Sequence, residues 1–339
     1  MAYQWKAELD RLLAQGAAYA DVRYHPREEH STLMIWNGNM HAFARDAESG
    51  FGVRVLYDGA WGFAAASDLS NIPAVFDRAL ENARVAARRV GRPIRLADKE
   101  VVSGQFVSPC TEDPLLTPLS TQVDFLMQLD KRLDAPGVEQ RLVSIDAMSK
   151  TVAYYDTQGA HIEKTIREIF PGMQVRATGA SGDMQRRSWQ PPRLGDTRGW
   201  EVMDQALWES EADRITDELR QLKEAPACPD GLRSVILLPD MMYLQVHETI
   251  GHALELDRIL GYELSYAGGS FVRLEDFGVL RYGSPKLNAR ADATLPNSPG
   301  SFGYDDDGVP AKNTMLIENG ILVGAITSRQ MVTEANERA

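Results

Sequence analysis

The chain has 339 residues, of which 44% are hydrophobic and 25% are charged, as is usual for a globular protein. Its 36 basic and 48 acidic residues give a formal net charge of −12, which argues against a nucleic-acid-binding surface. The first residues carry no secretory signal, and no apolar run approaches the roughly 20 residues that span a bilayer. Cys110 and Cys228 are too far apart in sequence for a disulfide framework. These features predict a cytoplasmic protein that binds neither nucleic acid nor membrane.

The first hundred residues predict a helix, a group of antiparallel strands and a second helix. Segments 6–16 and 72–91 have apolar positions three and four apart and end at a glycine, which is typical of amphipathic helices. The intervening segments are rich in β-branched and aromatic residues. The dipeptides Asn37-Gly38 and Asp58-Gly59, which favour tight hairpin turns, separate them. We place an N-terminal α/β module at residues 1–106.

The same order of elements returns after a Pro-rich connector. Segments 121–137 and 199–225 predict helices, and the residues between them predict a meander of antiparallel strands, which gives a central α/β module at 107–227. The C-terminal module at 228–339 begins with an apolar strand, 234–240, followed by a helix over 241–260. It also contains a hairpin over 313–327 that turns at Asn319-Gly320.

Strands and helices do not alternate in the way that a parallel α/β fold requires. The sequence therefore predicts the α+β class, with antiparallel sheets flanked by helices. We expect two N-terminal helix–sheet–helix modules and a mostly-β C-terminal module that carries a metal-binding helix.

The segment that indicates a catalytic site runs from His247 to His252 and reads HETIGH. Zinc peptidases hold their metal with two imidazoles and use a nearby carboxylate as general base, and His-Glu-x-x-His places these groups on one helix face. Here the histidines are five apart. On a regular helix this spacing rotates by about 500° and leaves the two rings roughly 140° apart. The motif therefore requires a π-bulge, and we expect Gly251 to tolerate the distortion.

Ordinary alternatives exist for each candidate residue. The chain has six histidines, so a chance match to this pattern, with each histidine in a core or surface role, is one alternative. Glu255 could be a substitute metal ligand or could support His252 from behind. Cys228, in a Pro-flanked linker, is a weaker ligand candidate. The acidic run 305–307 lacks the spaced ligands of a calcium loop and predicts a solvated turn.

From Cys228 onward the chain resembles the TldD/PmbA family of metallopeptidases, specifically its TldD-type subunits. The resemblance lies in ILLPD, VHETIGHALELDRILGYE, YAGGSF and GSFGYDDDGVPAKNTMLIENGILVGAI, and the five-residue histidine spacing is itself the family signature. It implies zinc as cofactor, His247 and His252 as zinc ligands, and Glu248 as general base. It also implies hydrolysis of peptides or unfolded polypeptides by a homodimer, or by a heterodimer with a PmbA-type subunit.

The family takes its third zinc ligand from a cysteine in a Cys-Gly loop far toward its C-terminus, and no residue here matches it. We therefore expect a C-terminally truncated TldD-type subunit that binds zinc weakly. The alternative function is a non-catalytic peptide-binding or partner subunit, or a fragment of a TldD/PmbA-type dimer. The presence of Glu248 between two intact histidines favours the enzymatic function over the non-catalytic one, because a site that has lost its activity has no need for all three residues.

Overall fold

The computed structural model describes residues 2–192 and 194–338. Its largest element is a seven-stranded sheet with the order β3-β2-β1-β5-β6-β4, in which β7 pairs with the C-terminal part of β6. All neighbouring strands are antiparallel except β4 and β6, which are parallel. The strands are β1 (Tyr19–Trp36), β2 (Asn39–Tyr57), β3 (Ala60–Ala66), β4 (Ser103–Val107), β5 (Gln140–Asp156), β6 (His161–Thr178) and β7 (Met184–Trp189).

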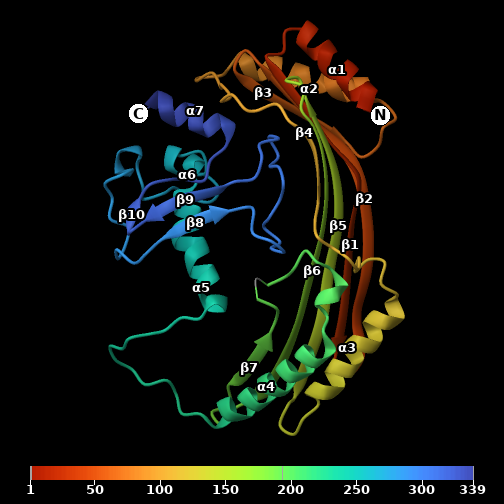
Figure 1. The fold of residues 1–339 in the computed structure, drawn as a ribbon, viewed down its shortest axis with the longest axis vertical. Helices are drawn as coiled ribbons and strands as arrows, with labels where there is room; N and C mark the ends of the chain where they lie inside the picture. The colour runs from red at the N-terminus through yellow and green to blue at the C-terminus, as the bar shows by residue number, and fades with distance from the viewer. Residues whose placement is uncertain (1, 193, 339) are drawn as a thin grey trace.

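Helices cover the two ends of this long, curved sheet (Figure 1). One end carries α1 (Ala2–Ala14) and α2 (Ile72–Ala87), and the other carries α3 (Leu119–Leu133), the short 3₁₀ helix η1 (Trp200–Val202) and α4 (Gln205–Glu224). Each end has its own hydrophobic core. Trp5 and Phe76 lie in the first core, and Leu126 and Trp208 lie in the second.

The long strands belong to both cores. In β1, Ala20 and Val22 pack in the first core, whereas Leu33 and Ile35 pack in the second. A register shift in the β1–β2 pairing, after His25, lies between the two parts of the strand. The two predicted N-terminal modules are thus hydrogen-bonded within one sheet. The proposed division into 1–106, 107–227 and 228–339 stays a prediction.

The C-terminal region contains a three-stranded sheet with the order β10-β9-β8. Its elements are α5 (Pro239–Val246), η2 (His247–Gly251), η3 (His252–Leu254), α6 (Leu256–Leu260), η4 (Leu274–Asp276), β8 (Ala289–Asp292), β9 (Asn313–Glu318), β10 (Ile321–Leu322) and α7 (Arg329–Arg338). The predicted hairpin is confirmed, because Asn319 and Gly320 form the β9–β10 turn with φ of 50° and 79°. The antiparallel α+β class is confirmed as well.

The apolar strand predicted over 234–240 is wrong. Residues 232–238 are coil, α5 begins at Pro239, and the side chain of Ile236 is 92% exposed. A strand needs a hydrogen-bonding neighbour, and within 2–192 and 194–338 no other segment pairs with these residues. In Figure 1 this stretch is part of the long trace between α4 and α5.

The C-terminal region lies on the concave side of the long sheet (Figure 1), and an acidic loop fastens it there. Asp307 accepts hydrogen bonds from Arg54 Nη2 on its Oδ1 atom and from Lys99 Nζ on its carbonyl oxygen, each at 2.6 Å. Asp306 Oδ1 lies 3.0 Å from Lys164 Nζ on β6. The predicted turn is present, and the Asp306 side chain is 79% exposed. The loop is more than a solvated turn, however, because Arg54, Lys99 and Lys164 from distant parts of the chain bind it.

The last helix makes a second attachment to the N-terminal part of the chain. Trp61 Nε1 on β3 donates to Gln330 Oε1 at 2.9 Å, and Arg329 Nε donates to the Ala97 carbonyl at 2.8 Å. These contacts attach α7 to the N-terminal part of the chain. Among the described residues, no helix is both long enough and apolar enough to cross a bilayer.

Candidate metal centre

The helix that carries the two histidines is irregular where they occur. The α-helical turns of α5 end at Val246, and His247–Gly251 form a π-helical turn in which the His252 N–H donates to the His247 carbonyl. A 3₁₀ turn, His252–Leu254, follows directly. The prediction that this helix takes up one extra residue between the histidines is confirmed.

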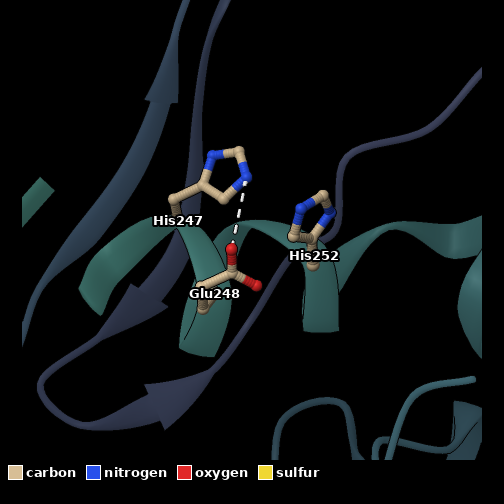
Figure 2. Close-up of side chains that lie close together, drawn as sticks. All are labelled: His247, Glu248 and His252. Carbon is tan, nitrogen blue, oxygen red and sulfur yellow. Dashed lines mark ion pairs between the residues drawn. The ribbon is translucent and has the colours of Figure 1, made fainter. Parts of the chain in front are cut away.

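The π turn brings the two imidazoles together. Their ring centroids are 4.3 Å apart and their planes meet at 86°, and Figure 2 shows both rings on the same side of the helix. Glu248 Oε1 lies 3.9 Å from His247 Nε2. One ligand atom from each of His247, Glu248 and His252 can be chosen so that all lie within 4.8 Å of one another. Among the described residues, no other three His, Cys, Asp or Glu side chains meet in this way.

Gly251 is not required by the geometry of the bulge. Its φ of −53° and ψ of −68° lie in the right-handed helical region that any residue adopts. A Cβ atom built on it would approach only the Val246 carbonyl oxygen, at an ordinary contact distance of 3.9 Å. The expectation that Gly251 accommodates the distortion therefore has no steric basis here.

The helix places its apolar side on the small sheet and its polar side outward. Ile250 and Leu254 are 7% and 0% exposed and pack in one cluster with Leu316 and Ile317 of β9. The side chains of His247 and Glu248, by contrast, are 56% and 60% exposed. Burial of the apolar side thus fixes the orientation in which the histidines and Glu248 face outward.

An open pocket of about 390 Å³ adjoins this polar side. Glu248 and His252 line it together with Ser270, Phe271 and Tyr282, which come from a later part of the chain. Residues far apart in the sequence therefore converge on one open space beside the helix.

Glu255 lies behind His252 and outside the three-residue group. Its Oε2 atom is 3.4 Å from His252 Nδ1, and Arg258 Nε donates to the same oxygen at 2.8 Å. Because Glu255 contacts Nδ1 of His252, Nε2 is the ring nitrogen of His252 that is left to bind a metal. Cys228 is exposed and also lies outside the group.

Two hydroxyl side chains that the sequence did not point to hold the irregular helix. Tyr282 donates to the carbonyl oxygen of Thr249, and Ser270 Oγ donates to the Ala253 carbonyl at 2.6 Å. Burial raises the pKa of the Tyr282 phenol, which keeps its hydroxyl protonated and able to donate. These partners are 33 and 17 residues away from the carbonyls that they contact, and no motif marks them in the sequence.

The residues present fit a transition-metal ion. Imidazole nitrogens are donors that Zn²⁺ accepts, and the π turn brings two of them to one side of the helix, with the Glu248 carboxylate beside them. The pocket beside them leaves space for a substrate. Two imidazoles and a carboxylate beside an open pocket are the arrangement that metallopeptidases use.

Comparison with known families agrees with that class. The PmbA/TldA metallopeptidase C-terminal domain matches residues 231–338, and the PmbA/TldA metallopeptidase domain 1 matches residues 20–83. The chain belongs to the PmbA/TldD metallopeptidase family. At the level of the family, its relatives are named metalloproteases.

A metalloprotease of Methanocaldococcus jannaschii is 26% identical over 325 residues, which cover 95% of this chain and 68% of that protein. A zinc metalloprotease TldD homologue of Saccharolobus solfataricus is 36% identical over 101 residues, or 29% of this chain and 20% of that protein. The chain spans about two thirds of the length of the first curated relatives that it matches.

Two solved structures share the fold at low sequence identity. A Thermotoga maritima protein described as a candidate modulator of a DNA gyrase has a TM-score of 0.76 and 17% identity, and the match covers 99% of this chain and 73% of that one. TldE from Thermococcus kodakarensis has a TM-score of 0.56 and 14% identity, over 96% of this chain and 71% of that one.

Proposed function

We propose that the protein is a zinc-dependent peptidase in which His247 and His252 bind the metal and Glu248 is the general base. The observation that carries the proposal is the π turn. A five-residue spacing would separate the rings on a regular helix, and the bulge returns them to a centroid distance of 4.3 Å beside a carboxylate. A surface histidine pair with no shared ligand has no need for this irregularity.

When bound, Zn²⁺ supplies Lewis-acid chemistry and lowers the pKa of water in its coordination sphere. Glu248, whose side chain reaches the pocket, would take a proton from the attacking water and pass it to the leaving amine. Glu255 would orient His252 through Nδ1 and is itself fixed by Arg258. This geometry favours a supporting role for Glu255 over a ligand role.

The substrates that we propose are peptides or unfolded polypeptides, because the pocket is open and its wall combines Ser270 with the aromatic side chains of Phe271 and Tyr282. We also propose a cytoplasmic location and a dimer, formed with a second copy or with a PmbA-type subunit. Apolar side chains in the coil that precedes α5, such as Leu232 and Ile236, are exposed, and covering them would be favourable. Light scattering of the purified protein tests the dimer.

The test of the catalytic role is Glu248→Gln. Both imidazoles remain, so we expect zinc content to be kept while peptide hydrolysis falls by about a hundredfold or more. Zinc is measured by elemental analysis and hydrolysis with an unfolded protein substrate. Glu263→Gln in the same region serves as a control, because Glu263 is absent from the pocket wall. Equal hydrolysis by Glu248→Gln and the parent would contradict the role of Glu248.

A further inference from the structure

The π turn is held from outside the helix by one phenol. The Tyr282 hydroxyl donates to the carbonyl oxygen of Thr249, which lies in the middle of the turn between the two histidines. Thr249 Oγ1 also donates to the carbonyl of Gln245, in the preceding helix α5, at 2.5 Å. Thr249 is therefore anchored at both its side chain and its backbone, and only the backbone anchor comes from another part of the fold.

Tyr282 is itself held firmly. Its N–H donates to the Gly320 carbonyl at 2.8 Å, and the Gly320 N–H donates to the Leu287 carbonyl at 2.9 Å. Its ring lies against Phe271 with centroids 5.6 Å apart. The β9–β10 turn, which contains Gly320, thus fixes the phenol that contacts the helix.

A π turn needs such support, because a regular α-helix is the more stable arrangement for most sequences and π turns are rare. If residues 247–251 returned to a regular α-helical ladder, the two histidines would point roughly 140° apart. They could then no longer share a ligand. Any contact that favours the π turn over the regular ladder therefore favours the arrangement in Figure 2.

We propose that Tyr282 is a positioning residue for the metal centre, which acts by holding the Thr249 carbonyl so that His247 and His252 stay on one side of the helix. The inference rests on the proposed metal role of the two histidines. Removal of one hydrogen bond of ordinary strength should shift the equilibrium between the π turn and other conformations, and so weaken metal binding, by about two- to tenfold.

Tyr282 also lines the pocket, so a direct role toward substrate is the competing explanation. The two roles differ in what they change. A positioning residue changes metal affinity and the stability of the π turn in the absence of substrate. A residue that acts only on substrate changes hydrolysis alone.

The experiment compares Tyr282→Phe with the parent and with Tyr266→Phe, a control at a side chain that is 92% exposed. Phenylalanine keeps the ring on Phe271 and removes only the hydroxyl. Co²⁺ is the probe, with its affinity measured by chelator competition and its geometry by visible absorption. Hydrogen exchange of the amides in 247–252 is followed without metal.

We expect Tyr282→Phe to bind Co²⁺ about two- to tenfold more weakly, with an altered spectrum and faster exchange over 247–252, and Tyr266→Phe to match the parent. Unchanged affinity, spectrum and exchange in Tyr282→Phe would overturn the positioning role, whatever happens to hydrolysis. His247→Ala separates this failure from a failure of the proposed function. If His247→Ala binds Co²⁺ as the parent does, the metal site itself is wrong and the inference falls with it.

Discussion

Replacing Lys99 with methionine should weaken the attachment of the acidic loop to the long sheet. The Lys99 side chain is 2% exposed, and its Nζ lies 2.6 Å from Asp156 Oδ2 and 2.6 Å from the Asp307 carbonyl oxygen. Methionine fills a similar volume but provides no charge and no donor. The substitution therefore leaves the Asp156 carboxylate, which is fully buried, without its cation.

The expected cost follows from the burial of this pair. Breaking a buried ion pair by removing one partner costs about 3–5 kcal/mol. Asp156 keeps hydrogen bonds from the N–H groups of Gln158 and Ala160, each at 2.9 Å, and from the Tyr154 hydroxyl at 3.1 Å. These remaining donors partly satisfy the carboxylate, so we expect a loss near the lower end, about 3 kcal/mol.

The assay is the free energy of unfolding from urea titration, followed by circular dichroism. Lys6→Met is the matched control, because Lys6 pairs with Asp10 at the surface, where the two side chains are 73% and 58% exposed. That variant should lose at most about 1 kcal/mol. If Lys99→Met also stays within about 1 kcal/mol of the parent, the buried pair does not stabilise the protein as the structure implies.

Two further predictions concern other parts of the chain. Burial raises the pKa of the Cys110 thiol to about 11, so at pH 8 only about one thousandth of it is thiolate. Iodoacetamide should therefore modify exposed Cys228 first, as mass spectrometry of timed samples can show. A Cβ added at Gly62 would lie 2.2 Å from backbone atoms of α2. Gly62→Ala should therefore lower the free energy of unfolding, measured by urea titration, by about 1–3 kcal/mol. Gly91→Ala should not lower it, because a Cβ added there would have no atom within 4 Å.

A specific result would contradict each of these two predictions. Equal alkylation rates for the two cysteines at pH 8 would show that Cys110 is not shielded as its surroundings indicate. Equal stability of Gly62→Ala and Gly91→Ala would show that α2 does not pack against β3 as closely as the structure has it.

Local sequence patterns were sufficient for most of the helices and turns and for the irregular helix. Apolar periodicity predicted the helices, and Asn37-Gly38, Asp58-Gly59 and Asn319-Gly320 marked turns in which Asn37, Asp58 and Asn319 adopt positive φ. The five-residue spacing of the histidines predicted the π turn, because helix geometry leaves no other way for the two rings to meet. These inferences depend on residues that are close in the sequence.

Features that depend on distant partners were not predictable in this way. The sharing of one sheet by both halves of the N-terminal region depends on the pairing of β1 with β5, which no local pattern specifies. The docking of Asp307 depends on Arg54 and Lys99, more than 200 residues away. Tyr282 likewise meets Thr249 only through the fold. For residues 234–238 the sequence predicted a strand that does not form, because strand propensity alone does not provide a hydrogen-bonding partner.

The central claim is that His247 and His252 bind one metal ion through the π turn. X-ray absorption at the zinc edge of the zinc-loaded protein tests it most directly. We expect two imidazole nitrogens at about 2.0–2.1 Å from zinc, and loss of both from the spectrum, together with the bound zinc, in the His247→Ala/His252→Ala variant. Zinc held by the parent with no imidazole in its first shell, or retained equally by the double variant, would contradict the claim.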